Sequence, residues 1–121
     1  MRGVVPVTLA AAAACTAALT LAPETTGAGV KPVTRKATVG DYYFTPAKMT
    51  VRRGSTIAWT WPADNSDTHD IELKKGPRGV KRFQSPMASA DFTYRRKLTV
   101  AGTYKIICTL HEEMTQTITV R

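Results

Sequence analysis

Cysteine and histidine are both scarce in this chain of 121 residues. It contains two of each, and the first cysteine, Cys15, lies inside an apolar N-terminal stretch. Without that stretch a single cysteine remains, Cys108, and an intramolecular disulfide is excluded. Cys108 is then a free thiol, an intermolecular bridge or a metal ligand. In an oxidising compartment a free thiol is a liability unless something occupies it.

Acidic residues are also few, with nine Asp and Glu against seventeen Lys and Arg and a formal net charge of +8. This excess favours acidic partners or anionic surfaces. The basic residues are scattered as pairs, with one triplet at Arg95–Lys97, and such groups on strands are typical of solvated faces. We therefore expect no nucleic-acid partner, whereas association with a membrane surface stays open.

Only one long apolar run is present, and it lies at the N-terminus. Arg2 precedes a stretch from Val4 to Ala22, which Pro23 and Glu24 end. This order is typical of a secretory signal peptide. A retained membrane anchor is the alternative, because the run is about long enough to span a bilayer, but it is rich in alanine and weakly hydrophobic. We expect residues 1–29 to be signal peptide and leader, and residues 30–121 to form an extracytoplasmic domain: periplasmic, secreted or at the cell surface.

Cys15 itself allows a second interpretation of the leader. It follows three alanines and so resembles a poor bacterial lipoprotein cleavage site, without the usual leucine three places earlier. The apolar run continues past it, whereas a lipidated cysteine normally ends such a run. We interpret Cys15 as part of the signal peptide, with lipid anchoring as the lesser alternative.

No segment has the period of an amphipathic helix; the pattern after Thr34 is that of short strands. Apolar residues alternate in Ile57–Trp61 and His69–Leu73, and Tyr104–Cys108 and Ile118–Val120 each place theirs on one face. Gly- and Pro-containing turns separate these runs, and Gly76–Ala90 is either a loop or one short helical turn. This predicts an all-β protein, a Greek-key β-sandwich or barrel of about seven to eight strands, and we expect a monomer.

The stretch Cys108-Thr-Leu-His111-Glu-Glu-Met114 holds most of the chemistry in this chain. It places a thiolate, an imidazole and a thioether within seven residues, between two apolar strands, on what we expect to be one loop. The remaining histidine, His69, follows a polar loop and is expected to open a strand at an end of the sandwich. Soft sulfur ligands with imidazole suit copper.

These residues and their spacing resemble the cupredoxins, the type 1 blue copper proteins, in their plastocyanin and amicyanin-like members. The short interval between His111 and Met114 is closest to amicyanin. The resemblance continues upstream in three patterns: Asp41-x-x-Phe44-x-Pro46, Met49-x-Val51-x-x-Gly54 and Ile57-x-Trp59.

The resemblance implies one type 1 copper ion, with His69, Cys108 and His111 in a plane and Met114 as the weak axial ligand. It further implies a carrier that passes single electrons between redox partner proteins, and not an enzyme. His111, on the loop, would be the exit route for the electron. Copper binding for transport or sequestration is the alternative function, and a structural or adhesive sandwich without metal is a third.

Several positions depart from the pattern of the family. Asp70 follows the first histidine where Asn is common; an Asp can accept the same backbone bonds but adds charge. Leu110 replaces a Pro, and Glu112 and Glu113 replace the Pro-Phe pair of an apolar docking patch. The two glutamates suggest basic contacts around His111, whereas the net charge suggests an acidic partner.

Three other interpretations of these residues are weaker. His111-Glu112 lacks the second histidine of a zinc-protease motif, because position 115 is Thr on an expected strand. Asp64, Asp67 and Asp70 lack the Gly and terminal Glu of a calcium loop, so we interpret them as a solvated loop. Trp59 and Trp61 could form a platform for a ligand, but we expect them to be core or edge aromatics instead.

Overall fold

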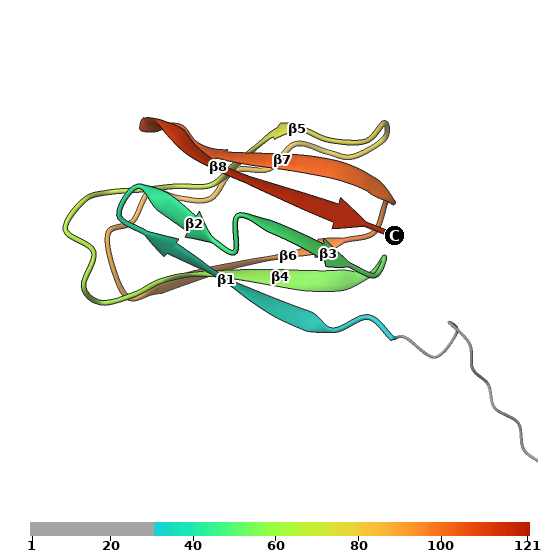
Figure 1. The fold of residues 1–121 in the computed structure, drawn as a ribbon, viewed down its shortest axis with the longest axis horizontal. Helices are drawn as coiled ribbons and strands as arrows, with labels where there is room; N and C mark the ends of the chain where they lie inside the picture. Colours follow the sequence, from blue (N-terminus) through green and yellow to red (C-terminus); the bar gives the residue numbers. More distant parts are fainter. Residues whose placement is uncertain (1–30) are drawn as a thin grey trace, which may run out of the picture.

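The computed structural model describes residues 31–121, and these residues form eight β-strands (Figure 1). The strands are β1 (Thr34–Gly40), β2 (Tyr43–Thr45), β3 (Lys48–Val51), β4 (Ser55–Trp61), β5 (Glu72–Lys75), β6 (Phe92–Leu98), β7 (Gly102–Cys108) and β8 (His111–Val120). Within residues 31–121 no helix is long and apolar enough to cross a membrane. The expected signal peptide and Cys15 lie outside the described residues.

The strands form two four-stranded sheets that pack face to face. One sheet has the order β2-β1-β4-β6, and the other has the order β3-β8-β7-β5. β1 pairs with β4, and β3 with β8, in parallel; the other pairings are antiparallel. The prediction of an all-β sandwich of seven to eight strands is confirmed.

The predicted alternation of β4 and β7 identifies the core. Ile57, Trp59 and Trp61 from β4 are at most 1% exposed, and so are Tyr104 and Ile106 from β7. Because successive side chains of a strand point to opposite faces, each strand directs one row into the space between the sheets. The two tryptophans are core residues, as expected.

One polar contact crosses this core. The indole Nε1 of Trp59 donates to Oε1 of Gln116 on β8, at 2.9 Å, and Gln116 Nε2 donates to the carbonyl of Pro46. Gln116 is 1% exposed, so its amide would be costly without these partners. The bond fixes β4 against β8 and thereby one sheet against the other.

The segment Gly76–Ala90 is a loop and forms no helical turn, so the first of the two expectations holds. It is tied to the sheets by isolated bridges from Gln84 to Glu72 and from Ala88 to His69. Phe83 and Ser85 of this segment are buried.

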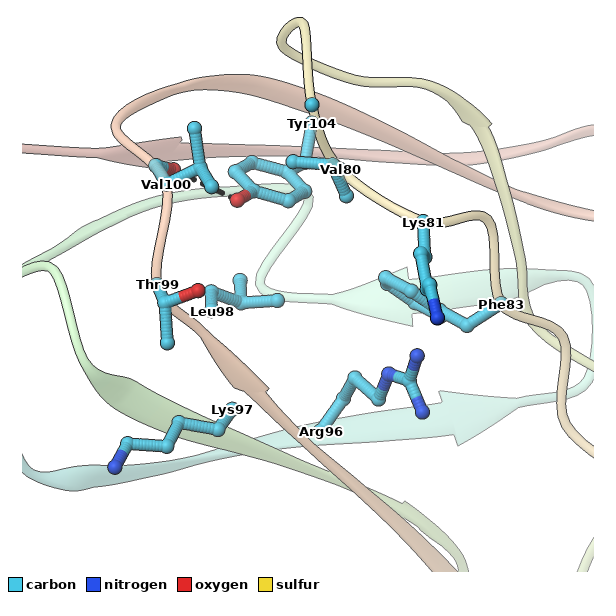
Figure 2. Close-up of a pocket in the computed structure, with 10 residues that line it drawn as sticks. Val80, Lys81, Phe83, Arg96, Lys97, Leu98, Thr99, Val100 and Tyr104 are labelled. Atoms are coloured by element: carbon cyan, nitrogen blue, oxygen red, sulfur yellow. Dashed lines mark hydrogen bonds between the residues drawn. The ribbon is translucent and has the colours of Figure 1, made fainter.

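A surface hollow of about 340 Å³ opens between this segment and the end of β6 (Figure 2). Within it the guanidinium of Arg96 lies 4.8 Å from the ring centroid of Phe83, and the Tyr104 hydroxyl donates to the carbonyl of Val100. None of the four predicted metal ligands lines this hollow.

Strand direction decides which turns meet. β1, β4 and β7 end where β6 and β8 begin, at the left of Figure 1. The turn 41–42, the loops 62–71 and 84–91, and the turn 109–110 therefore gather at one end of the sandwich. That end holds both histidines and Cys108.

Candidate metal site

Three of the four predicted ligands meet at this end. The ligand atoms of His69, Cys108 and His111 all lie within 4.8 Å of one another. Nδ1 of His69 is 3.2 Å from Nδ1 of His111, which is 3.5 Å from the Sγ of Cys108. His69 is fully buried and Cys108 is 2% exposed, whereas 22% of the His111 side chain is exposed. The structure thus brings together His69 and Cys108, which lie 39 positions apart in the sequence, with His111 beside them.

Met114 lies beside this cluster, but not on the loop that the sequence predicted. The connection between β7 and β8 is only Thr109–Leu110. Cys108 ends β7, His111 begins β8 and Met114 is the fourth residue of β8, so none of the three lies on the loop where they were expected. Cys108 pairs with His111 and Ile107 with Thr115, so residues 112–114 bulge out of the ladder. Bulges re-aim side chains, and here Met114 is 1% exposed and lines a hollow with His111 and Tyr42.

His69 does not open a strand, which corrects the expectation from its alternating pattern. It lies three residues before β5, in an isolated bridge where it exchanges both backbone bonds with Ala88. Its carbonyl also accepts from the indole Nε1 of Trp61, at 3.1 Å. The bridge with Ala88 in the loop 84–91 replaces strand pairing. The bond from Trp61, a core residue, holds the backbone of His69 against the core.

Asp70 is buried, so the interpretation of Asp64, Asp67 and Asp70 as a solvated loop is wrong for this residue. Its Oδ1 accepts from the backbone N–H of Thr109, and its Oδ2 accepts from the Thr109 hydroxyl and from Gln84, all at 2.8–2.9 Å. The expected backbone bond is therefore present. It ties the His69 segment to the turn between Cys108 and His111.

The other nitrogen of each imidazole meets a carboxylate. Nε2 of His69 lies 2.8 Å from Oδ1 of Asp41, and Nε2 of His111 lies 3.3 Å from Oδ2 of Asp67. Tyr42 donates its hydroxyl to the same Oδ2 at 2.8 Å. The sequence analysis noted Asp41 only within the upstream pattern and gave Tyr42 no role. Their turn precedes His69 by 27 or more residues, and no local spacing signals that contact.

The charges around the site are fixed by these bonds. The bonds from His69 and from Ser66 hold the pKa of Asp41 well below its usual range. The bond from Tyr42 lowers the pKa of Asp67, and the same bond raises the pKa of Tyr42. Burial raises the pKa of the Cys108 thiol, so a metal that binds there must displace a proton.

The donor set fits a soft or borderline transition metal. Two nitrogens bonded to one ion at about 2.0–2.1 Å lie no more than about 4.2 Å apart, and the two Nδ1 atoms are within that limit. A thiolate with two imidazoles and a thioether suits copper in both of its common oxidation states. Carboxylates, which calcium and magnesium prefer, lie around the cluster but not at its centre.

Comparison with known proteins gives the same assignment. Residues 32–121 match the family of copper binding proteins described as the plastocyanin/azurin family. The chain is similar in structure to an oxidised amicyanin variant, at 22% identity and a TM-score of 0.64, over 73% of this chain and 82% of that one. It is similar to the reduced Cu(I) form of another amicyanin variant, at 23% identity and 0.64, over 78% and 88%.

A copper-containing nitrite reductase from Thermus scotoductus is also similar, at 23% identity and a TM-score of 0.63. The match covers 82% of this chain but 25% of that one. Comparison with curated protein sequences found no match. These structural likenesses support the fold, and the family match supports copper binding.

Proposed function

Because the chain belongs to the plastocyanin/azurin family of copper-binding proteins, we propose that it carries single electrons through one type 1 copper ion. Cys108, His69 and His111 would hold the ion, and Met114 would be a weaker fourth ligand. The observation that supports this most is the convergence of two Nδ1 atoms and one Sγ at one end of the sandwich, where His69 and Cys108 are buried.

Bound copper supplies a couple between Cu(I) and Cu(II) that exchanges one electron. The chain's own residues keep the donor atoms in place in both states. Trp61 and Ala88 hold the backbone of His69, and Asp70 holds the turn that follows Cys108. These restraints would limit the movement of the ligands when an electron is gained or lost, and a small reorganisation would favour a fast transfer.

His111 is the donor nearest to solvent, so we propose that partners approach over its imidazole. The surface around it is mixed: Asp67, Glu112 and Glu113 bring negative charge, and the exposed Tyr42 and Leu110 lie beside them, so it differs from the uncharged apolar patch that the resemblance implied. The loops that gather here contain no Lys or Arg. A redox partner that presents a basic face would be complementary to this end.

The positive charge lies elsewhere in the described domain. Arg52 and Arg53 occupy the turn between β3 and β4, and Arg78, Lys81 and Arg82 lie in the loop after β5, toward the end opposite the metal site. The glutamates beside His111 and the basic excess of the chain, which gave opposite expectations for the partner, thus lie at different ends of the domain. An extracytoplasmic carrier of this kind could rest its basic part on an anionic surface while its acidic end meets a partner.

Electron self-exchange tests the proposed function. In mixtures of oxidised and reduced copper protein, we expect proton NMR lines of residues near the site to broaden with the oxidised fraction, as rapid exchange requires. A challenge with a copper chelator on the same sample separates the alternative. Slow self-exchange together with rapid loss of copper to the chelator would favour transport or sequestration and contradict the proposal.

A further inference from the structure

Both imidazoles of the site have a carboxylate at the nitrogen that faces away from the cluster. Asp41 lies 2.8 Å from Nε2 of His69, and Asp67 lies 3.3 Å from Nε2 of His111. The two carboxylates come from different segments, the turn between β1 and β2 and the loop between β4 and β5. This paired arrangement requires an explanation beyond the four ligands.

The hydrogen bond to Asp41 and the close approach of Asp67 decide which nitrogen of each ring is free to bind a metal. A neutral imidazole has one N–H donor and one acceptor nitrogen, and a carboxylate only accepts. Nε2 of each ring must therefore carry the hydrogen, which leaves both Nδ1 atoms as acceptors. These acceptors face one another at 3.2 Å, with the sulfur of Cys108 at 3.5 Å from one of them. Two lone pairs at that distance are satisfied by a shared cation and not by each other.

The carboxylates are themselves held in place. The backbone N–H and hydroxyl of Ser66 donate to Oδ2 of Asp41, and the backbone N–H of Asp67 donates to its Oδ1. Asp41 thus fixes the loop that carries Asp67. Tyr42 completes the arrangement by donating to Oδ2 of Asp67.

Tyr42 adopts a backbone conformation that a non-glycine residue rarely takes, with φ of 70°. Its ring packs edge-on against both imidazoles, with centroids 5.7 Å from that of His69 and 4.9 Å from that of His111. Strained residues of this kind persist where surrounding contacts over-determine them, often at functional sites. The conformation places one side chain over both histidines and against Asp67.

We propose that Asp41 and Asp67, the latter held by Tyr42, are positioning residues that fix both imidazoles as Nε2–H tautomers and favour Cu(II) over Cu(I). The inference rests on the proposed copper site. Outer carboxylates orient a ligating histidine and make it a stronger base, and their loss typically weakens metal binding about 10–100-fold. Two negative charges this close also stabilise the more positive oxidation state.

The first test uses the copper-free protein and so does not depend on metal binding. Nitrogen-15 NMR of the histidine rings at alkaline pH should show the Nε2–H tautomer for both His69 and His111. In Asp67→Ala the His111 ring should become a mixture of tautomers, while Asp64→Ala, at an exposed carboxylate of the same loop, should leave both rings unchanged. An Nδ1–H tautomer in the wild type would overturn the proposal.

The second test measures the reduction potential of the copper-loaded variants Asp41→Asn and Asp67→Asn. The amide oxygen can still accept from Nε2, so these changes chiefly remove charge. If each loss weakens Cu(II) binding tenfold more than Cu(I) binding, the potential rises by about 59 mV. Asp64→Asn, which removes the same charge from an exposed position, should raise it much less.

The outcomes separate the two proposals. Equal potentials in Asp67→Asn and Asp64→Asn would overturn the role of the outer carboxylates while leaving the copper site intact. Failure of the wild type to take up copper would instead contradict the proposed function, and the NMR result would still decide the tautomers. Asp41→Asn loosens the loop at Ser66 and could prevent folding. In that case the Asp67→Asn variant alone still tests the role of the outer carboxylates.

Discussion

Single residues near the metal site make more structural contacts than their positions in the sequence suggest. Asp70 makes three hydrogen bonds although it is fully buried, and these bonds join the segments of both histidines. A buried charge is tolerated only where such partners satisfy it. The resemblance predicted the backbone bond of Asp70 but not its burial, which depends on the loop 84–91 whose Gln84 donates to the Asp70 carboxylate.

Asp70→Ala should destabilise the copper-free protein. It removes the acceptor of the Thr109 N–H and of two side chains, and hydrogen bonds to a charged group contribute about 1.5–3 kcal/mol each in favourable cases. We expect a loss of at least about 2 kcal/mol in the free energy of unfolding, measured with urea. Asp64→Ala is the control, and equal effects of the two changes would contradict the structural role of Asp70.

Met114→Gln should keep copper at the site and lower its reduction potential. An amide oxygen is a harder ligand than a thioether and so favours Cu(II), and the axial ligand tunes the potential of such sites. Voltammetry of the wild type and the variant measures the shift. An unchanged potential would show that Met114 is only a core residue, as its burial alone would allow.

At the scale of strands, the sequence predicted which side chains face the core, because period-two alternation specifies them. It did not predict which segments pair with a neighbouring strand. β4 and β7 show the expected buried rows, because each has neighbours on both sides. His69 was expected in a strand, yet pairing there is limited to one bridge with Ala88. Alternation shows which residues face the core, but a ladder also requires a neighbouring strand in register.

Trp59→Phe tests the contact between the sheets. The variant leaves Oε1 of Gln116 buried without its donor, which costs about 1–3 kcal/mol, and adds the cost of the lost indole volume. Urea unfolding of Trp59→Phe, Gln116→Leu and the double variant measures the coupling. The double variant should cost less than the two single changes together, and strict additivity would show that the bond contributes nothing.

At the scale of the whole molecule, the metal site and the acidic residues around it lie at one end of the sandwich, and basic residues gather toward the opposite end. His69, Cys108 and His111 meet at one end, with Met114 beside them, because strand direction brings the ends of β4 and β7 to the end of the sandwich where β8 begins. Sequence reasoning could propose this set, since the short motif and a single remaining histidine left few combinations. It could not find Asp41 and Tyr42, whose contact with the histidines depends on how the turn between β1 and β2 folds over the site.

Copper should raise the melting temperature of the domain, because it binds the site that only the folded chain assembles. At a free concentration 100 times Kd the gain is about 2.7 kcal/mol, or roughly 10–20 °C for a domain of this size. Thermal melting with and without copper measures it. Cys108→Ser should lose most of the shift, and a shift that persists in this variant would place the copper elsewhere.

The absorption and electron paramagnetic resonance spectra of the purified copper-loaded protein test the central claim most directly. A thiolate from Cys108 bound to Cu(II) beside two imidazoles predicts an intense visible band from charge transfer and the narrow copper splitting of a type 1 site, both absent in Cys108→Ser. A copper-loaded wild type that is colourless, with the wide splitting of an ordinary nitrogen and oxygen site, would contradict the account.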